Sequence, residues 1–204
     1  MLPRLAVVSA HRSTSRDLAL IAIFAGIVAA LGVVPAVYPV GLTVPITAQS
    51  MGVMLAGSIL GARRGFAALA LFLALVAVGL PLLAGGRGGL GVFAGASVGF
   101  LLAYPVCAGV IGWLVERGGP AYRLGWGIVA NVVGGIVVLY AAGIVGMLVV
   151  LHVGVWQAVV LNAWFLLFDS VKVVLAAVVA RGVHAAYPGL LGRPRTRRSE
   201  TAVV

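Results

Sequence analysis

The positions of the basic residues constrain this chain more than any other feature of its sequence. Twelve of its 14 Lys and Arg residues fall in four stretches: before Leu18, at Arg63 and Arg64, at Arg117 and Arg123, and from Arg181 onward. Long apolar runs separate these stretches, and only Arg87 and Lys172 lie within them. Cytoplasmic loops of membrane proteins carry an excess of Lys and Arg. The pattern therefore predicts both a membrane protein and its orientation.

The composition agrees with the lipid bilayer as the main solvent. Hydrophobic residues make up 63% of the chain and charged residues 9%, which is too little charge for a soluble domain to cover its surface. A spanning helix needs about 20 mostly apolar residues, so six helices with short connections use nearly all 204 residues. The net charge of +10 does not indicate nucleic-acid binding, because the basic residues lie at the expected membrane boundaries rather than on one face.

Prolines, glycines and charges divide the chain into six predicted helices. We expect them at about residues 18–34, 44–60, 66–80, 92–115 or 96–115, 124–151 and 155–180. An even number of helices places both termini on one side, and the basic stretches place that side in the cytoplasm. The predicted fold is an all-α integral protein of the cell membrane with three parts: a cytoplasmic N-terminal segment (1–17), a transmembrane domain (18–181) and a basic cytoplasmic tail (182–204).

Three charged side chains within the apolar part are the best candidates for a binding site. Asp169 and Lys172 lie three residues apart and so share one helix face. Each costs roughly 2.5–3.5 kcal/mol at the membrane centre, and ions that persist there normally pair and mark a substrate path. A structural ion pair and a pair that opens toward a ligand both remain possible. Arg87 lies in the glycine-rich run 84–91, where a guanidinium and backbone N–H groups can bind an anion; the alternative is a flexible turn.

Other polar and small residues permit a structural or a functional interpretation. The amide of Gln49 suits a ligand or an interhelical hydrogen bond, and Asn131 and Asn162 favour the structural role. Small residues recur at helical spacing in the first predicted helix and either pack within the chain or dock another membrane subunit; they are Ala22, Ala25, Gly26, Ala29 and Ala30. The sequence shows no nucleophile–base arrangement and no metal-ligand spacing, so we expect neither catalysis nor a metal.

Several short motifs follow one another in a specific order: RDLALIA (16–22), VPITAQ (44–49), GVMLAG (52–57), GLP (79–81), AGGRGGLG (84–91) and Asp169-x-x-Lys172. In this order they resemble the BioY family, the substrate-binding (S) components of biotin transporters of the energy-coupling factor (ECF) class. The resemblance covers about residues 16–180. It implies six helices, an outward-facing biotin cavity near the first and third loops, and no cofactor. It also implies two partners, a transmembrane coupling (T) protein and cytoplasmic ATPase subunits.

The resemblance also assigns roles to residues. Asp169 is expected to accept from the ureido N–H groups of biotin, Arg87 to bind the carboxylate, and Lys172 to bind the ureido oxygen or orient Asp169; which cation meets the carboxylate stays open. Gln49 is a further ligand-binding candidate, and the expected cavity walls are Phe93, Phe100, Trp164 and Phe168. The small residues Ala22, Ala25, Gly26 and Ala29 are expected to dock the coupling protein.

Two segments depart from the family's usual pattern. Residues 95–100 (GASVGF) replace a Gly-Pro-Thr-Gly-Gly-Tyr-like turn, and residues 162–168 (NAWFLLF) replace a Pro-Phe turn. Because both lie near the expected cavity, an S component for another small vitamin remains an alternative. An intramembrane enzyme acting on lipid and a passive channel or scaffold are alternatives from other classes.

Overall fold

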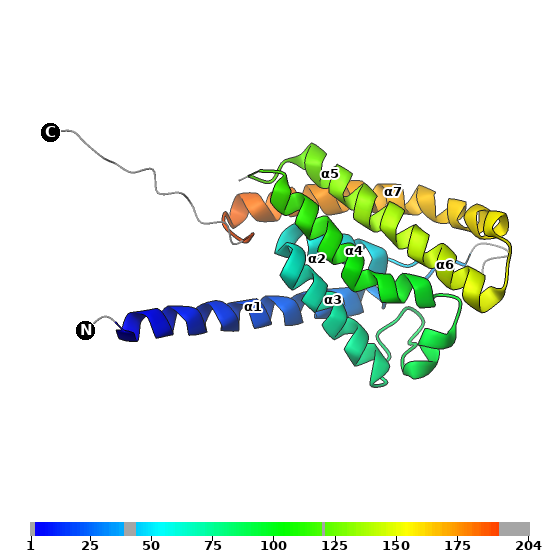
Figure 1. The fold of residues 1–204 in the computed structure, drawn as a ribbon, viewed down its shortest axis with the longest axis horizontal. Helices are drawn as coiled ribbons and strands as arrows, with labels where there is room; N and C mark the ends of the chain where they lie inside the picture. The colour runs from blue at the N-terminus through cyan, green and yellow to red at the C-terminus, as the bar shows by residue number, and fades with distance from the viewer. Residues whose placement is uncertain (1–2, 39–43, 120, 192–204) are drawn as a thin grey trace.

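Helices form nearly all of the regular structure of this chain. The computed structural model describes residues 3–38, 44–119 and 121–191, with side chains from residue 14 onward (Figure 1). Its elements are α1 (Pro3–Leu31), α2 (Gln49–Leu60), α3 (Ala62–Ala77), the 3₁₀ turn η1 (Leu90–Ala94), α4 (Val98–Arg117), α5 (Leu124–Val132), the π-helical turn η2 (Val133–Val138), α6 (Leu139–Leu151) and α7 (Val155–Ala186). Within the described residues, extended pairing is limited to two isolated bridges, Val37 with Ile46 and Leu83 with Arg87.

The observed elements follow the six predicted helical segments, with corrections at their ends. α5, η2 and α6 continue into one another, so residues 124–151 form one helical rod as expected. α1 begins at Pro3 rather than near Leu18, because no glycine or proline interrupts the polar stretch after Pro3, and proline suits the first position of a helix. α2 begins at Gln49 rather than near Val44, because Pro45 and the bridge at Ile46 hold the preceding residues extended.

Four of the helical segments are long and apolar enough to cross a membrane. They are residues Thr14–Leu31, Val98–Arg117, Leu124–Leu151 and Val155–Ala186. α2 has 12 residues and α3 has 16. At 1.5 Å per residue, α2 is about 18 Å long, less than the roughly 30 Å of a hydrocarbon core.

The short helix α2 lies in the interior of the bundle (Figure 1). It packs against α1, α3, α4 and α7, and ten of its 12 residues are buried. A helix that is apolar all round belongs in such a position. Its N-terminal end therefore meets several other elements at one point, and the polar residues there form the candidate site.

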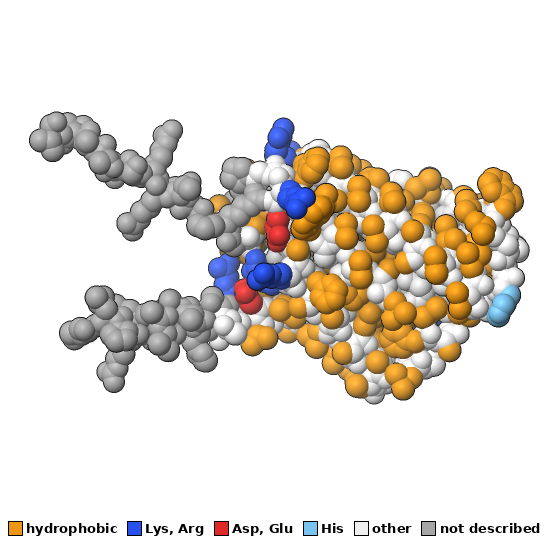
Figure 2. Space-filling view, in the orientation of Figure 1, with side chains coloured by type: hydrophobic (Ala, Val, Ile, Leu, Met, Phe, Trp, Pro, Cys, Tyr) orange, Lys and Arg blue, Asp and Glu red, His pale blue; other side chains and the backbone are white. Residues whose placement is uncertain are grey.

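Charged side chains gather at one end of the molecule. In the space-filling view they lie where both termini leave the bundle, and hydrophobic side chains cover most of the remaining face (Figure 2). Arg64 pairs with Asp17 at 3.2 Å, and the guanidinium of Arg117 lies 3.7 Å from the ring centroid of Trp113. Basic residues next to tryptophan are typical of a membrane–water interface.

Candidate functional site

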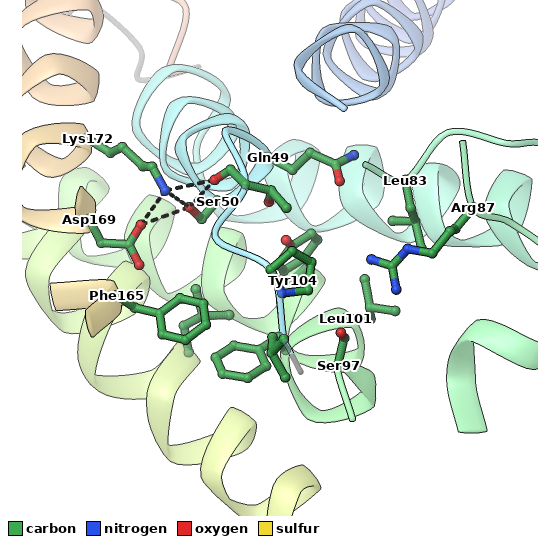
Figure 3. A pocket seen from close by; sticks show the side chains of 15 residues that line it. Gln49, Ser50, Leu83, Arg87, Ser97, Leu101, Tyr104, Phe165, Asp169 and Lys172 are labelled. Atoms are coloured by element: carbon green, nitrogen blue, oxygen red, sulfur yellow. Dashed lines mark hydrogen bonds and ion pairs between the residues drawn. The ribbon is translucent and has the colours of Figure 1, made fainter. Parts of the chain in front are cut away.

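An enclosed cavity lies between the start of α2, the connection after α3, and helices α4, α6 and α7 (Figure 3). Its volume is about 50 Å³, and its lining combines a few polar groups with apolar and aromatic side chains. The lining residues are Val44, Pro45, Thr47, Gln49, Ser50, Leu83, Arg87, Ser97, Phe100, Leu101, Tyr104, Leu139, Phe165, Asp169 and Lys172. Convergent polar groups in an apolar setting are typical of a small-molecule site.

The carboxylate of Asp169 lines one side of this cavity. It is 2% exposed, and three side chains donate to it: Lys172 Nζ to Oδ1 at 2.6 Å, Ser50 Oγ to Oδ1 at 3.0 Å, and Tyr140 OH to Oδ2 at 2.9 Å. A carboxylate has about four acceptor positions. One position on Oδ2 is therefore left for a further donor.

The ammonium group of Lys172 has its three protons engaged. Nζ donates to the Thr47 carbonyl oxygen at 2.7 Å, to Ser50 Oγ at 3.0 Å and to Asp169 Oδ1 at 2.6 Å. A lysine has three donors in all. In this arrangement Lys172 holds Asp169 against the extended residues before α2.

Most donors of Arg87 have no partner among the residues that the structure describes. Nε donates to the Ala84 carbonyl oxygen at 3.1 Å, and among the described residues no partner is recorded for the two Nη atoms. Figure 3 shows the guanidinium across the cavity from Asp169. Gly85 and Gly86 have φ of +78° and +69°, which residues with a Cβ rarely adopt. These two glycines make the turn that returns Arg87 toward the cavity.

Gln49 connects the cavity to its surroundings. Its Nε2 donates to the carbonyl oxygens of Val28 at 3.2 Å and Leu82 at 3.0 Å, and its Oε1 accepts from the Ala84 N–H at 3.3 Å. Both amide protons are thus used inside the chain. Gln49 ties α1 to the loop that carries Arg87, which is the interhelical role considered from the sequence.

The aromatic wall differs partly from the expected one. Phe100 lines the cavity and stacks with Phe165 at a centroid distance of 5.7 Å, but Phe93 is not among the lining residues. Trp164 and Phe168 do not line it either, and they are 54% and 38% exposed. Residues four apart share a helix face, so Phe165 faces inward with Asp169, and Trp164 and Phe168 share the neighbouring, outward face.

Several contributors to the site were missed in the sequence. Ser50 and Thr47 flank Gln49, and their only signal was a cluster of polar residues around a proline. Tyr140 was one hydroxyl in an apolar run, and nothing local linked it to Asp169, 29 positions away. The remaining predicted polar residues behave as structural ones: Asn131 bonds Ser58 and the Val173 carbonyl, and Asn162 bonds the Ala158 carbonyl.

A second, more open hollow adjoins the cavity. Its volume is about 440 Å³, and it is lined by residues of the 86–97 segment. Arg87 and Ser97 line both spaces. The enclosed cavity therefore lies next to a larger space, with Arg87 at the junction.

The small residues of α1 do not all lie on one surface. Ala22 and Gly26 are exposed, Ala29 is half-buried, and Ala25 is buried against the chain's own helices. A side-chain Cβ at Gly26 would meet no atom within 4 Å. The exposed small face of α1 therefore continues through Ala22, Gly26 and Ala30.

The geometry suits a ligand with a hydrogen-bond donor at one end and an anion at the other. Asp169 accepts on one side of the cavity, the phenylalanine pair supplies an apolar wall, and Arg87 offers a guanidinium near the outer hollow. A planar guanidinium matches a carboxylate in a bidentate arrangement. The arrangement therefore suits a small acid whose two ends are bound by different chemistry.

Known proteins are similar to this chain in sequence and in fold. A biotin transporter BioY of Rhodobacter capsulatus is 46% identical over 188 residues, covering 86% of this chain and 97% of that protein. The biotin transporter BioY of Rhizobium etli is 45% identical, covering 88% and 99%. The crystal structure of the S-component for biotin from an ECF-type ABC transporter superposes with a TM-score of 0.82 at 26% identity, over 85% of this chain and 93% of that one. The BioY family model matches residues 7–189, and the chain therefore belongs to the BioY family.

Proposed function

We propose that this chain is the biotin-binding S component of an ECF-type vitamin importer in the cell membrane. It captures biotin from outside and, with a transmembrane coupling protein and cytoplasmic ATPase subunits, delivers it to the cytoplasm. The chain itself catalyses no reaction. The names of its BioY relatives and the similar S-component for biotin support this assignment.

One observation carries the proposal. The carboxylate of Asp169, a hydrogen-bond acceptor, and the guanidinium of Arg87, a cation, face each other across one cavity. Asp169 has one acceptor position left after three hydrogen bonds, which suits an N–H of the ureido ring. The enclosed cavity of about 50 Å³ is small for a whole ligand, since sites for drug-sized molecules measure roughly 300–1,000 Å³. The acid tail therefore extends toward the outer hollow, where Arg87 lies.

The count of unused donors favours Arg87 over Lys172 as the partner of the carboxylate. Lys172 has no proton left for a ligand, whereas the Nη groups of Arg87 have no partner among the described residues. We assign the biotin carboxylate to Arg87 and the orientation of Asp169 to Lys172. Gln49 acts indirectly, because it holds Leu82 and Ala84, which precede Arg87.

The shortness of α2 is compatible with six crossings and cytoplasmic termini. Non-helical backbone at membrane depth is tolerated where it lines a cavity, and Val44, Pro45 and Thr47 before α2 line the site. The three extended residues 45–47, at about 3.3 Å each, add roughly 10 Å to the 18 Å of α2. Residues 44–60 then reach across most of a hydrocarbon core of about 30 Å, with the extended part toward the outside.

The exposed small residues of α1 are the proposed docking surface for the coupling protein. Ala22 and Gly26 are accessible, and Ala29 is partly so. Ala25 is buried at 4% exposure, so it supports this surface from inside rather than touching a partner. Small residues let helix backbones approach closely in lipid.

Calorimetric titration of the purified chain with biotin tests the proposal. We expect saturable binding that Asp169→Asn weakens by about 1.5–3 kcal/mol, the range for a hydrogen bond to a charged group. Arg87→Gln is expected to weaken biotin but to leave its uncharged methyl ester unchanged. Lys172→Gln is expected to weaken both ligands, because it releases Asp169.

Two results would reject this assignment. Unchanged biotin binding by a folded Asp169→Asn variant would remove Asp169 from the site. Saturable binding of a different vitamin with no binding of biotin would favour the alternative S component. Circular dichroism of each variant checks that the helices are intact.

A further inference from the structure

A polar hollow lies at the end of the bundle opposite the biotin site. Its volume is about 470 Å³, and it is formed by α1, the α2–α3 junction, the end of α4 and the segment after α7. Three arginines line it, Arg16, Arg63 and Arg64, with the acids Asp17 and Glu116. Leucines of α2 and of the segment after α7 complete its wall. The hollow therefore offers cationic and apolar surface together.

The two acids in this hollow already have donors. Asp17 accepts from Arg64 Nη1 at 3.2 Å, and Glu116 Oε1 accepts from the Ala62 N–H at 2.8 Å. Arg64 also donates to the Leu190 carbonyl oxygen, which joins the segment after α7 to α3. Arg64 is thus engaged at both of its Nη atoms.

Arg16 and Arg63 carry charge that the described residues do not pair. Both side chains are exposed, and no ion pair is recorded for either one within the described part of the chain. They come from different helices, α1 and α3, and line the same space. Two guanidinium groups that line one hollow suit an anion with several oxygen atoms.

We propose that this hollow binds the phosphate of an anionic phospholipid of the inner leaflet. Guanidinium groups bind phosphate oxygens in bidentate geometry, and basic pockets on the cytoplasmic side of membrane helices suit lipid head groups. A free phosphate would use the same arginines. The leucines favour the lipid over a free phosphate. Apolar side chains beside the cations can contact the glycerol and acyl parts of a phospholipid, whereas they make no favourable contact with a hydrated ion.

The test is lipid binding to the intact, detergent-solubilised chain, measured by native mass spectrometry. Dioleoyl-phosphatidylglycerol is titrated against dioleoyl-phosphatidylcholine and, in a separate arm, inorganic phosphate. The variant is Arg16→Gln/Arg63→Gln. Its matched control is Arg123→Gln/Arg181→Gln, which removes the same charge from two exposed arginines that do not line the hollow.

Phosphatidylglycerol is expected to bind the unmodified chain more tightly than phosphatidylcholine. The Arg16→Gln/Arg63→Gln variant is expected to bind phosphatidylglycerol about tenfold more weakly than the unmodified chain does. The control variant is expected to lose less than about threefold. If Arg16→Gln/Arg63→Gln does not fold by circular dichroism, Arg16→Lys/Arg63→Lys replaces it, with a smaller loss expected because charge remains. Equal losses in both pairs, or equal binding of the two lipids, would overturn the proposal. The proposal would also be overturned if the Arg16→Gln/Arg63→Gln variant lost binding of inorganic phosphate but kept binding of phosphatidylglycerol.

Discussion

At the scale of single residues, the site depends on how many hydrogen bonds each polar group has left. Lys172 uses its three protons within the chain, and Gln49 uses both of its amide protons. Buried polar groups without partners are costly, so these internal hydrogen bonds of Lys172 and Gln49 fix the shape of the site. Among the described residues, Asp169 and Arg87 keep unused hydrogen-bonding capacity. This difference supports the proposal that these two groups meet a ligand, while Lys172 and Gln49 position them.

Tyr140→Phe is expected to weaken biotin binding by about 1 kcal/mol, roughly fivefold. The change removes the O–H that donates to Asp169 Oδ2 at 2.9 Å but keeps the ring against Phe165. The measurement is calorimetric titration. Tyr122→Phe is the control, because Tyr122 does not line the cavity. Equal affinities in the two variants would show that Tyr140 does not orient Asp169.

Residue types predicted the charged part of the site but only one of its aromatic wall residues, Phe100. Asp169, Lys172 and Arg87 stood out because charges are rare in apolar runs. Phe165, Trp164 and Phe168 look alike in the sequence, since each is an aromatic residue within five positions of Asp169. The rotation of α7 about its own axis selects Phe165, and that rotation is set by packing against α2, α5 and α6.

At the scale of elements, α4 and α6 cross at two glycines, Gly99 and Gly146, where the two backbones lie close together. A Cβ on Gly146 would lie 2.6 Å from the backbone nitrogen of Gly99 and 2.7 Å from its Cα. Backbone atoms cannot move aside as a flexible side chain does. Close approach through small residues is the usual way in which helices associate in lipid.

Gly146→Ala is therefore expected to destabilise the bundle by about 1–3 kcal/mol, the usual cost of overpacking. Thermal unfolding in detergent measures this change. Gly125→Ala in α5 is the matched control, because its Cβ would meet no atom within 4 Å. Alanine favours a helix over glycine by roughly 0.5–1 kcal/mol, so the control should be as stable as the starting protein or more so. A Gly146→Ala variant as stable as that control would contradict the close crossing.

The exposed face of α1 makes a different prediction. Gly26→Leu is expected to leave biotin binding by the isolated chain unchanged, because nothing lies within 4 Å of a Cβ there. Assembly with the coupling protein, followed by co-purification, should be lost because the helices can no longer approach closely. Ala141→Leu adds similar bulk to an exposed position of α6 and should assemble normally. Intact assembly of Gly26→Leu would place the docking surface elsewhere.

Helix positions followed from the apolar runs, but helix ends did not. The rod 124–151 agrees with the sequence, because its ends coincide with changes in polarity. The late start of α2 depends on the bridge between Val37 and Ile46, a contact between residues on both sides of a loop. Local propensity does not report such a contact.

At the scale of the whole molecule, charge decides orientation. In a Cys107→Ala background, which removes the one cysteine, we expect His152→Cys to react with a membrane-impermeant maleimide in intact cells. Arg123→Cys should react only after the cells are permeabilised, because basic connections stay in the cytoplasm. Both positions are exposed in the structure. Labelling of both in intact cells would reject the proposed topology.

The sequence by itself determined that this chain is a helical membrane protein, where its long helices run, and which charges break the pattern. It did so because burying a charge in lipid is costly enough to be visible residue by residue. Only the tertiary structure decided which side chains meet. In the structure, Tyr140 and Ser50 donate hydrogen bonds to Asp169, and Lys172 uses all three of its protons within the chain. The Nη groups of Arg87 have no partners among the described residues. These contacts join residues far apart in the chain, and they depend on how each helix is turned and packed, which no local pattern contains.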